Sequence, residues 1–319
     1  MKILITGVAG FIGFHIAQNL IKSKKNKIFG IDNFDDYYSV KLKKKRVSIL
    51  QKQKNFNFKK IDITNSLLSD YLRNKKFDIV IHLAAQAGVR YSMENPEKYL
   101  NTNILGFSNL LENLNPDNLK KILYASSSSV YGDTISFPTN EKNKTNPKNI
   151  YGYSKFINEV MSEYYSRKFN VPFVGLRFFT IYGTWGRPDM FILKLLNSHF
   201  RKKIFYLNNN GNHLRDFTSI NDVVKIIKKI IDKKKIKSDV YNVCSSNPIS
   251  INQVLKIISK NVGKIKTKNI NRHPADVLNT FGDNKKILKD YNFSRFSNFD
   301  FELKKIIDWF QKIKNNNYF

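Results

Sequence analysis

Residues 2–13 read Lys2-Ile3-Leu4-Ile5-Thr6-Gly7-Val8-Ala9-Gly10-Phe11-Ile12-Gly13, and an amphipathic segment follows through His15 to Leu20. The apolar run that opens this stretch is typical of a strand buried in a parallel sheet. Glycines between a strand and a helix permit a tight turn, and they let backbone N–H groups at the helix N-terminus approach a pyrophosphate. The stretch therefore predicts a dinucleotide-binding turn. Its expected cofactor contacts are Gly7, Gly10, Phe11, Ile12 and Gly13.

The second predicted strand, residues 27–31, runs directly into Asp32. A carboxylate at this position accepts hydrogen bonds from both ribose hydroxyls of an adenosine and repels a 2′-phosphate, so it favours NAD over NADP. The alternative is an aspartate that only caps a helix or closes a turn. The basic run at residues 41–46 also leaves NADP open.

Four further apolar runs indicate the remaining strands of the sheet, at residues 56–60, 79–83, 121–125 and 174–179. Their alternation with helical segments predicts an α/β fold with a Rossmann-type doubly wound parallel sheet. Such sheets bind ligands beyond the carboxyl ends of their strands. The further cofactor contacts expected there are Asp62, Ile63, Leu83, Ala84 and Ala85. We interpret His82, which lies within an apolar run, as a buried histidine with satisfied hydrogen bonds and not as a ligand.

The regular alternation of strands and helices weakens after Tyr182. We therefore expect a cofactor-binding domain over residues 1–182 and a smaller C-terminal α/β substrate-binding domain over residues 183–319. A segment near residues 239–243 is expected to return a strand to the main sheet.

The segment Tyr151-Gly152-Tyr153-Ser154-Lys155 places a tyrosine and a lysine one helical turn apart on the same helix face. A nearby ammonium lowers the pKa of a phenol, which a free tyrosine with a pKa of about 10 needs before it accepts a proton at neutral pH. The serine run at residues 126–129 begins where a strand is predicted to end, so one of its hydroxyls is expected to complete a proton path. The alternative is an ordinary surface pair of tyrosine and lysine.

The chain of 319 residues, 41% of them hydrophobic, is long enough for a sizeable core in one large or two moderate domains. No apolar run approaches the roughly 20 residues that span a bilayer, and the N-terminus lacks the features of a signal peptide. Cys244 is the single cysteine, which excludes an internal disulfide and a cysteine-rich metal site. We expect a cytoplasmic protein without membrane insertion and without a metal.

The formal net charge of +30 suggests nucleic-acid binding, because clustered Lys and Arg displace counterions from phosphates. The lysines are instead scattered among asparagines, as at residues 41–46, 225–237 and 256–268. These segments lack the aromatic residues with which single-strand binders stack on bases. We therefore expect no dedicated nucleic-acid binding, although the positive field favours anionic small molecules.

Together these features resemble the extended short-chain dehydrogenase/reductase superfamily and, within it, the UDP-glucuronate 4-epimerase family. The glycine motif, Ser127 and the pair Tyr151 and Lys155 carry the wider resemblance. The narrower one extends over nearly the whole chain and rests on residues 82–96, 124–132, 176–190 and 215–218 and on Asp276-Val277.

The chain departs from the family at a few positions near the reacting tyrosine and in two loops. The family usually has Pro-Tyr-Ala-Ala-Thr-Lys where this chain has Ile150 through Lys155, a proline at Thr184 and a glycine at Ala275. The tyrosine and lysine remain. The changes therefore concern the identity of the sugar more than the redox chemistry.

The resemblance implies 4-epimerisation of a UDP-hexuronic acid, UDP-glucuronate to UDP-galacturonate, through a 4-keto intermediate with tightly bound NAD. It implies that Tyr151 is the base, that Ser127 relays the proton and that Lys155 also holds the nicotinamide ribose. The 4-keto form of a glucuronate readily loses CO2. Neutral hydrogen-bond donors suit its carboxylate, because they hold it without imposing the geometry of decarboxylation. The implied substrate contacts are Ser128, Ser129, Thr180, Arg187, Arg215, Asp276 and Arg90.

Several other functions remain open. The nearest is 4-epimerisation of another nucleotide sugar, UDP-glucose or UDP-N-acetylglucosamine, and a nucleotide-sugar decarboxylase or 4,6-dehydratase is more remote. Where 4,6-dehydratases have an Asp-Glu pair, this chain has Ser128-Ser129, which argues against elimination. From a different class, the chain would be a nucleotide-binding or nucleic-acid-binding protein that keeps the fold without the chemistry. The resemblance also implies a homodimer that pairs through helices near residues 96–114 and 151–168.

Overall fold

The computed structural model describes residues 1–316 and 318. In that part of the chain, seven strands form one parallel sheet in the order β10-β6-β5-β4-β1-β2-β3. The strands are β1 (Lys2–Thr6), β2 (Lys27–Asp32), β3 (Phe56–Lys60), β4 (Ile79–His82), β5 (Lys121–Ser127), β6 (Phe173–Phe178) and β10 (Asp239–Val243). The order reverses between β1 and β4, the switch point at which doubly wound sheets bind ligands. The predicted Rossmann-type fold is confirmed.

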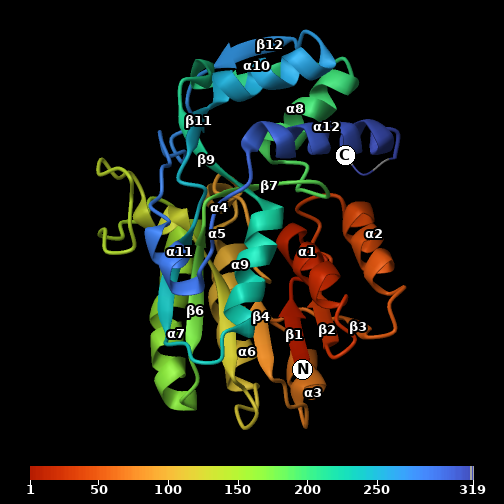
Figure 1. The fold of residues 1–319 in the computed structure, drawn as a ribbon, viewed down its shortest axis with the longest axis vertical. Coiled ribbons are helices and arrows are strands. Elements are labelled where there is room, and N and C mark those ends of the chain that lie inside the picture. The colour runs from red at the N-terminus through yellow and green to blue at the C-terminus, as the bar shows by residue number, and fades with distance from the viewer. Residues whose placement is uncertain (317, 319) are drawn as a thin grey trace.

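Helices cover both faces of this sheet (Figure 1). On one face lie α1 (Phe11–Leu20), α2 (Val40–Leu50), α9 (Ile220–Asp232) and α11 (Lys285–Tyr291). On the other lie α3 (Leu67–Leu72), α6 (Gly106–Glu112) and α7 (Ile150–Phe169). Ile3 and Ile5 of β1 pack into the first core and Leu4 into the second. Because alternate side chains enter cores on both faces, the strand is apolar throughout.

Two small sheets, drawn at the top of Figure 1, are formed by strands that follow β6 in the chain. They consist of β7 (Thr180–Tyr182), β9 (Leu214–Ser219) and β11 (Pro248–Ser250), and of β8 (Phe205–Asn208) and β12 (Thr267–Ile270). A third core forms among these strands and the helices α8 (Phe191–Phe200), α10 (Ile251–Val262) and α12 (Phe299–Ile313). The chain leaves the large sheet after β6 and returns to its edge as β10, which pairs with β6.

The chain between residues 91 and 112, which overlaps the helix expected near residues 96–114, is divided into several helical segments. They are α4 (Tyr91–Glu94), α5 (Pro96–Tyr99), the π-helical turn η1 (Leu100–Leu105) and then α6. The wide turn buries Asn103, whose amide donates to Gln86 O at 3.1 Å and to Ser154 Oγ at 2.9 Å. A π turn adds one residue to the helix, and here that turn joins the end of β4 to α7.

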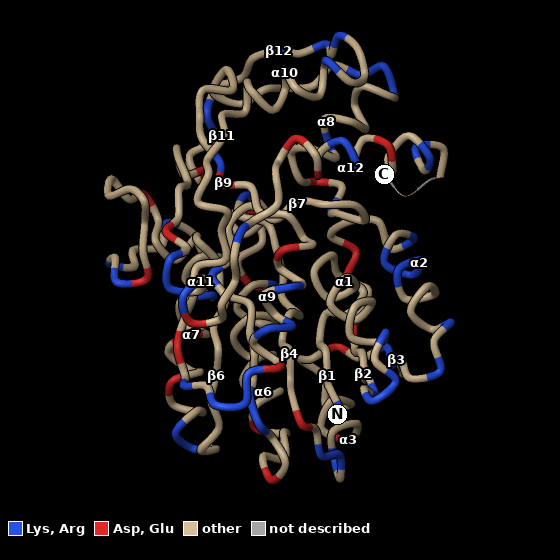
Figure 2. The backbone as a smooth tube through the Cα atoms, in the orientation of Figure 1, with Lys and Arg blue, Asp and Glu red and all other residues tan. Residues whose placement is uncertain are grey.

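The remaining short helices are η2 (Ser128–Tyr131) and η3 (Asn209–Gly211). We call residues 127–131 the serine turn. Lys and Arg lie on helices and loops of both the large and the small half of the molecule (Figure 2). Within the described residues, we find no helix with the length and apolar character needed to cross a membrane.

Gly152, in the first turn of α7, lies very close to the serine turn. A Cβ at this position would be 2.7 Å from the carbonyl oxygen of Ser129 and 3.1 Å from Cβ of Pro147. The side chain of Asn149 caps the helix by accepting the Gly152 N–H at 2.9 Å, which fixes the same turn. Glycine therefore lets the serine turn approach the helix more closely than alanine would.

We expect Gly152→Ala to lower the melting temperature, although alanine is favoured over glycine in a helix by about 1 kcal/mol. The new methyl group meets a backbone oxygen, which cannot rotate away, and overpacking typically costs about 1–3 kcal/mol. Gly106→Ala is the matched control, because the atoms nearest to its Cβ would be side-chain atoms of Ile63 and Thr64 and not a backbone oxygen. Thermal denaturation followed by circular dichroism compares the two. A melting temperature above wild type for Gly152→Ala would contradict the expectation.

Candidate active site

A cavity of about 510 Å³ opens at the carboxyl ends of β1, β2, β4, β5 and β6. This volume is typical of a site for a small molecule or cofactor. The sequence-predicted residues that line it are Gly7, Gly10, Phe11, Ile12, Gly13, Asp32, Ile63, Leu83, Ala84, Ala85, Ser127, Ser128, Ser129, Tyr151, Lys155, Thr180, Arg187, Arg215 and Asp276. The two other predicted residues, Asp62 and Arg90, contact residues of this lining.

The glycine turn forms the floor of the cavity at the switch point. Gly7 has φ +70°, and a Cβ there would lie 2.6 Å from the Ala84 nitrogen. A Cβ on Gly13 would lie 2.3 Å from the Gly7 carbonyl oxygen, so the turn also packs tightly on α1. Gly10, Phe11 and Ile12 at the start of this helix line the cavity, so a ligand there can approach their backbone, as a dinucleotide pyrophosphate requires.

Asp32 joins the glycine turn to the end of β2. Its carboxylate accepts hydrogen bonds from the backbone N–H of Ala9 at 3.0 Å and of Phe34 at 2.9 Å. Burial raises the pKa of this carboxyl, and the Lys43 ammonium opposes the shift. Each oxygen keeps a second acceptor site, so Asp32 can also bind two neighbouring hydroxyls from the cavity.

Asp62 lies beside the lining residues Ile61 and Ile63. Its carboxylate accepts from the Asn33 amide at 2.7 Å and from the backbone N–H of Thr64 at 2.9 Å. Burial acts to raise the pKa of Asp62, but these hydrogen bonds outweigh it and the pKa is lowered. Asn33, which lines the cavity, stands between the Asp62 carboxylate and a ligand there.

His82 is buried as expected and stacks on Phe107 with ring centres 4.6 Å apart, but the expectation that its hydrogen bonds are satisfied holds for only one of its two ring nitrogens. Thr6 Oγ1 accepts from the backbone N–H groups of Leu83 and Ala84, so its own proton is donated to His82 Nδ1 at 2.8 Å. Burial, and then the nearby Lys155, lower the pKa of His82 to about 3. Nε2 therefore carries the single ring proton, and it has no hydrogen-bond partner among the residues that the structure describes.

Tyr151, which is partly exposed at the cavity wall, and the buried Lys155 lie one helical turn apart on α7. Burial raises the pKa of Tyr151, whereas a hydrogen bond with Ser127 and the charge of Arg187 lower it. Arg187 is thus a cation that favours the phenolate, and the sequence had not predicted this role for it. Burial also lowers the pKa of Lys155, to about 8, so this side chain is mostly protonated at pH 7.

The serine turn is closed by its own hydroxyl groups. The Ser127 hydroxyl donates to Ser129 Oγ at 3.1 Å and accepts the backbone N–H of Ser129, also at 3.1 Å. Ser128, Ser129 and Thr180 add neutral hydroxyl groups to the same wall of the cavity.

Arg187 lies on the loop after β7 and lines the cavity. Its positive charge there acts on the phenol of Tyr151. It donates to Asp189 through Nε at 3.0 Å and Nη2 at 2.5 Å, and Tyr37 donates to the same carboxylate at 3.2 Å. Arg187 therefore both stabilises its loop and faces the cavity.

The opposite end of the cavity is formed by the loop that carries Asp276. Arg90 binds the Asp276 carboxylate with both arms of its guanidinium, Nε at 3.2 Å and Nη2 at 2.7 Å. Arg215 donates to the carbonyl oxygens of Val277 at 2.9 Å and Leu278 at 2.8 Å. Arg215 and Asp276 line the cavity, whereas Arg90 acts on it through Asp276.

The sequence did not identify two important cations, Lys43 and Arg46, within the basic run of α2. Lys43 lines the cavity and donates to Asp35 O at 2.6 Å. Arg46 is fully buried and donates to the carbonyl oxygens of Ala9 at 2.8 Å and Trp185 at 2.6 Å. The helical spacing that places both residues on one face of α2 with Leu42, Val47 and Leu50 could have identified them as buried. The surrounding lysines obscured this pattern.

Comparison with known proteins gives a consistent result for this site. Residues 3–244 match the NAD dependent epimerase/dehydratase family. The UDP-glucuronate 4-epimerase of Thermodesulfobacterium geofontis is 38% identical over 310 residues, which cover 96% of this chain and 95% of that protein.

Two solved structures extend the likeness. UDP-glucuronic acid 4-epimerase from Bacillus cereus, in complex with UDP-glucuronic acid and NAD, aligns with a TM-score of 0.93 at 32% identity over 98% of this chain and 100% of that one. UDP-N-acetylglucosamine 4-epimerase from Methanobrevibacter ruminantium aligns with a TM-score of 0.88 at 26% identity over 98% of each chain. The chain therefore belongs to the NAD-dependent epimerase/dehydratase family of extended short-chain dehydrogenases/reductases, whose members act on nucleotide sugars with NAD as cofactor.

Proposed function

We propose that the protein converts UDP-glucuronate to UDP-galacturonate by epimerisation at C4 through a transient 4-keto sugar. The observation that carries this proposal is the wall around Tyr151, which combines the neutral hydroxyls of residues 127–129 with the guanidinium of Arg187. Relatives that share 38% and 32% of their residues with this chain act on the same substrate by name.

Tyr151 is the proposed base. Its Oη accepts the proton of the C4 hydroxyl, directly or through Ser127, and returns a proton to the C4 oxygen when the configuration has inverted. Ser127 and Arg187 favour the phenolate that this role needs, against the effect of burial. NAD, when bound, supplies the acceptor and the donor of the C4 hydride.

The hydroxyl-rich wall suits a carboxylate that must survive the 4-keto stage. Ser128, Ser129 and Thr180 donate hydrogen bonds without adding a charge, and Arg187 already shares its charge with Asp189. Positions 128 and 129 hold serines, so the acid and base of an elimination are lacking at the positions where related 4,6-dehydratases have them. This favours epimerisation over dehydration.

We assign the two ends of the cavity to the two nucleotides. The glycine turn, Asp32 and Lys155 hold NAD, which their geometry fits, because the turn exposes helix N–H groups and Asp32 keeps free acceptor sites. Arg215 and Asp276 bind the UDP part of the substrate as donor and acceptor, with Arg90 orienting Asp276.

The substrate is tested by incubating the purified protein with UDP-glucuronate and no added cofactor, then recording the anomeric proton region by NMR. We expect the signal of UDP-galacturonate to appear. UDP-glucose and UDP-N-acetylglucosamine are run in parallel, because Gly152 shapes the wall beside Tyr151 differently from alanine. Turnover of one of these sugars without turnover of UDP-glucuronate would overturn the proposed substrate.

Tyr151→Phe is expected to keep the fold and bound NAD but to lose kcat by about 10²–10⁴-fold, the range typical of general acid–base catalysis. NMR turnover gives kcat, and acid release of the cofactor gives the NAD content. Tyr153→Phe is the matched control, since Tyr153 lies on the same turn of α7 but is exposed to solvent. Similar kcat values for the two variants would exclude Tyr151 as the base.

We also propose that the protein forms a homodimer through η1, α6 and α7. Leu100, Leu105, Val160 and Tyr164 are large apolar side chains on these helices, and all are exposed. Val160 and Tyr164 are four residues apart, so they form one stripe along α7. Burying such a stripe against a second copy removes apolar surface from water.

Light scattering after size exclusion is expected to give twice the chain mass of 37.3 kDa for the wild type. Val160→Asp is expected to give the single-chain mass, because it places a charge in the proposed interface. Leu67→Asp is the control, since Leu67 is equally exposed but lies on α3. A wild type of single-chain mass would contradict the dimer.

A further inference from the structure

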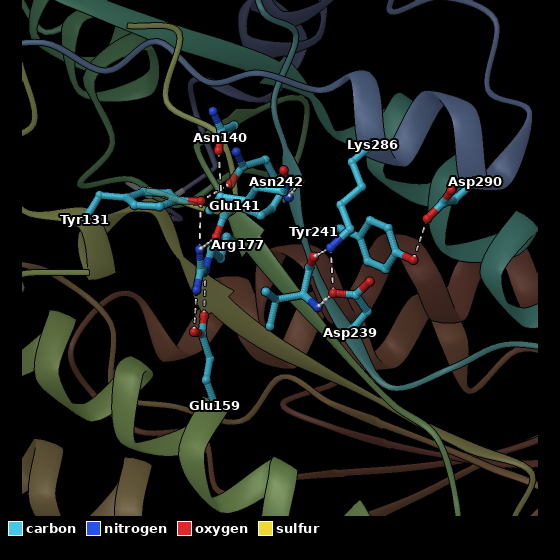
Figure 3. Close-up of polar contacts among 12 residues, drawn as sticks. Tyr131, Asn140, Glu141, Glu159, Arg177, Asp239, Tyr241, Asn242, Lys286 and Asp290 are labelled. Atoms are coloured by element: carbon cyan, nitrogen blue, oxygen red, sulfur yellow. Dashed lines mark hydrogen bonds and ion pairs between the residues drawn. The ribbon is translucent and has the colours of Figure 1, made fainter. Parts of the chain in front are cut away.

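A buried polar network begins at an ion pair between α7 and β6 (Figure 3). Arg177 donates to Glu159 through Nε at 2.8 Å and Nη2 at 2.7 Å, and the two side chains are 5% and 9% exposed. Breaking a pair this deeply buried leaves an uncompensated charge, which is strongly unfavourable. The pair therefore fixes the distance between the helix that carries Tyr151 and the neighbouring strand.

The same ion pair holds both ends of the serine turn. The Ser126 hydroxyl donates to Glu159 Oε1 at 2.5 Å, just before the turn begins. At its other end, Arg177 Nη1 donates to the hydroxyl oxygen of Tyr131 at 2.8 Å, and the guanidinium lies 4.8 Å from the centre of the Tyr131 ring. Ser127 and Ser129 lie between these two anchors.

The network then continues into the second half of the chain. The Tyr131 hydroxyl donates to Asn242 Oδ1 at 2.7 Å, and Asn242 Nδ2 donates to the carbonyl oxygens of Thr139 at 2.9 Å and Asp283 at 3.2 Å. Asp283 follows Gly282, whose N–H donates to Asp216 at 3.1 Å. The Tyr131 hydroxyl thus connects the serine turn to the segment around Gly282 and Asp283, which follows the loop that carries Asp276.

We propose that Tyr131 is a positioning residue, whose hydroxyl holds the serine turn so that Ser127 faces Tyr151. Tyr131 is 3% exposed and packs with Val130, Phe179 and Cys244, so it acts through the turn and not on the sugar. Its hydroxyl accepts from Arg177 and donates to Asn242, which uses both of its hydrogen-bonding functions and fixes its position. The inference rests on the proposed roles of Ser127 and Tyr151.

Tyr131→Phe tests the inference, because it removes one hydroxyl and keeps the ring against Arg177. We expect kcat to fall by about tenfold or more with KM nearly unchanged, since small displacements of catalytic groups are costly. We also expect the acidic limb of the kcat–pH profile to move to higher pH. Ser127 lowers the pKa of Tyr151, so displacing Ser127 raises that pKa and delays formation of the phenolate.

Tyr241→Phe is the matched control. Tyr241 precedes Asn242 on β10, is also buried, and its hydroxyl donates to Asp290 at 2.9 Å, away from the serine turn (Figure 3). A comparable loss of melting temperature is expected for both variants, with wild-type kcat and pH profile for Tyr241→Phe. If Tyr131→Phe has the same kcat and pH profile as this control, or changes KM alone, the network is only structural and the proposal is overturned.

A second variant decides the matter if Tyr131→Phe does not fold. Ser126→Ala removes the hydroxyl at the other anchor and leaves the ion pair intact, and it is expected to give the same loss of kcat and the same pH shift. An unchanged kcat and pH profile would then overturn the proposal. All variants are compared on whichever UDP-sugar the wild type turns over, so failure with UDP-glucuronate bears on the proposed substrate alone.

Discussion

The close approach of Gly7 to the end of β4 is the constraint on which the site depends. A Cβ on Gly7 would meet the backbone of Leu83 and Ala84 at 2.6–2.8 Å, so any other residue would separate the two strand ends. Thr6 holds the same ends together by accepting both backbone N–H groups of that segment. Only with β1 and β4 in contact do the glycine turn and the serine turn open into one cavity. The glycine is therefore needed for strand packing as well as for access to a pyrophosphate.

The electrostatics of the reacting pair follow from that packing. Burial favours the neutral form of each group, which raises the pKa of Tyr151 and lowers that of Lys155 to about 8. Ser127 and the positive charge of Arg187 oppose this effect on the phenol. The loop of Arg187 is held by Arg46, which donates to Trp185 O and Gly186 O and also to Ala9 O. One guanidinium thus fixes the glycine turn relative to the cation that acts on the tyrosine.

The parts of the fold and site that depend on neighbours in sequence were predictable. The strand β1, the glycine turn and the spacing of Tyr151 and Lys155 are local patterns, and they gave the fold, the cofactor and the face of α7 that meets the cavity. Contacts between distant segments were not predictable in this way. Arg187 is 36 positions from Tyr151 in the chain. Nothing in the spacing of either residue shows that the charge of Arg187 lowers the pKa of Tyr151.

Buried polar residues were the hardest to recognise, because their partners decide their meaning. Arg46 resembles the lysines around it, and Asn103 looks like one more asparagine until a π turn directs it at Gln86 and Ser154. Arg177 lies in an apolar strand, where a single arginine predicts a buried ion pair only if Glu159 is known to face it.

The strand β10 comes from the second half of the chain, and its contacts hold residues of the first half in place. By pairing with β6 and binding both Tyr131 and Asp283 O through Asn242, it fixes the segment after the Asp276 loop to the sheet edge near the serine turn. The two halves of the cavity are therefore aligned by buried hydrogen bonds on both sides, through Arg46 at one side and through Asn242 at the other.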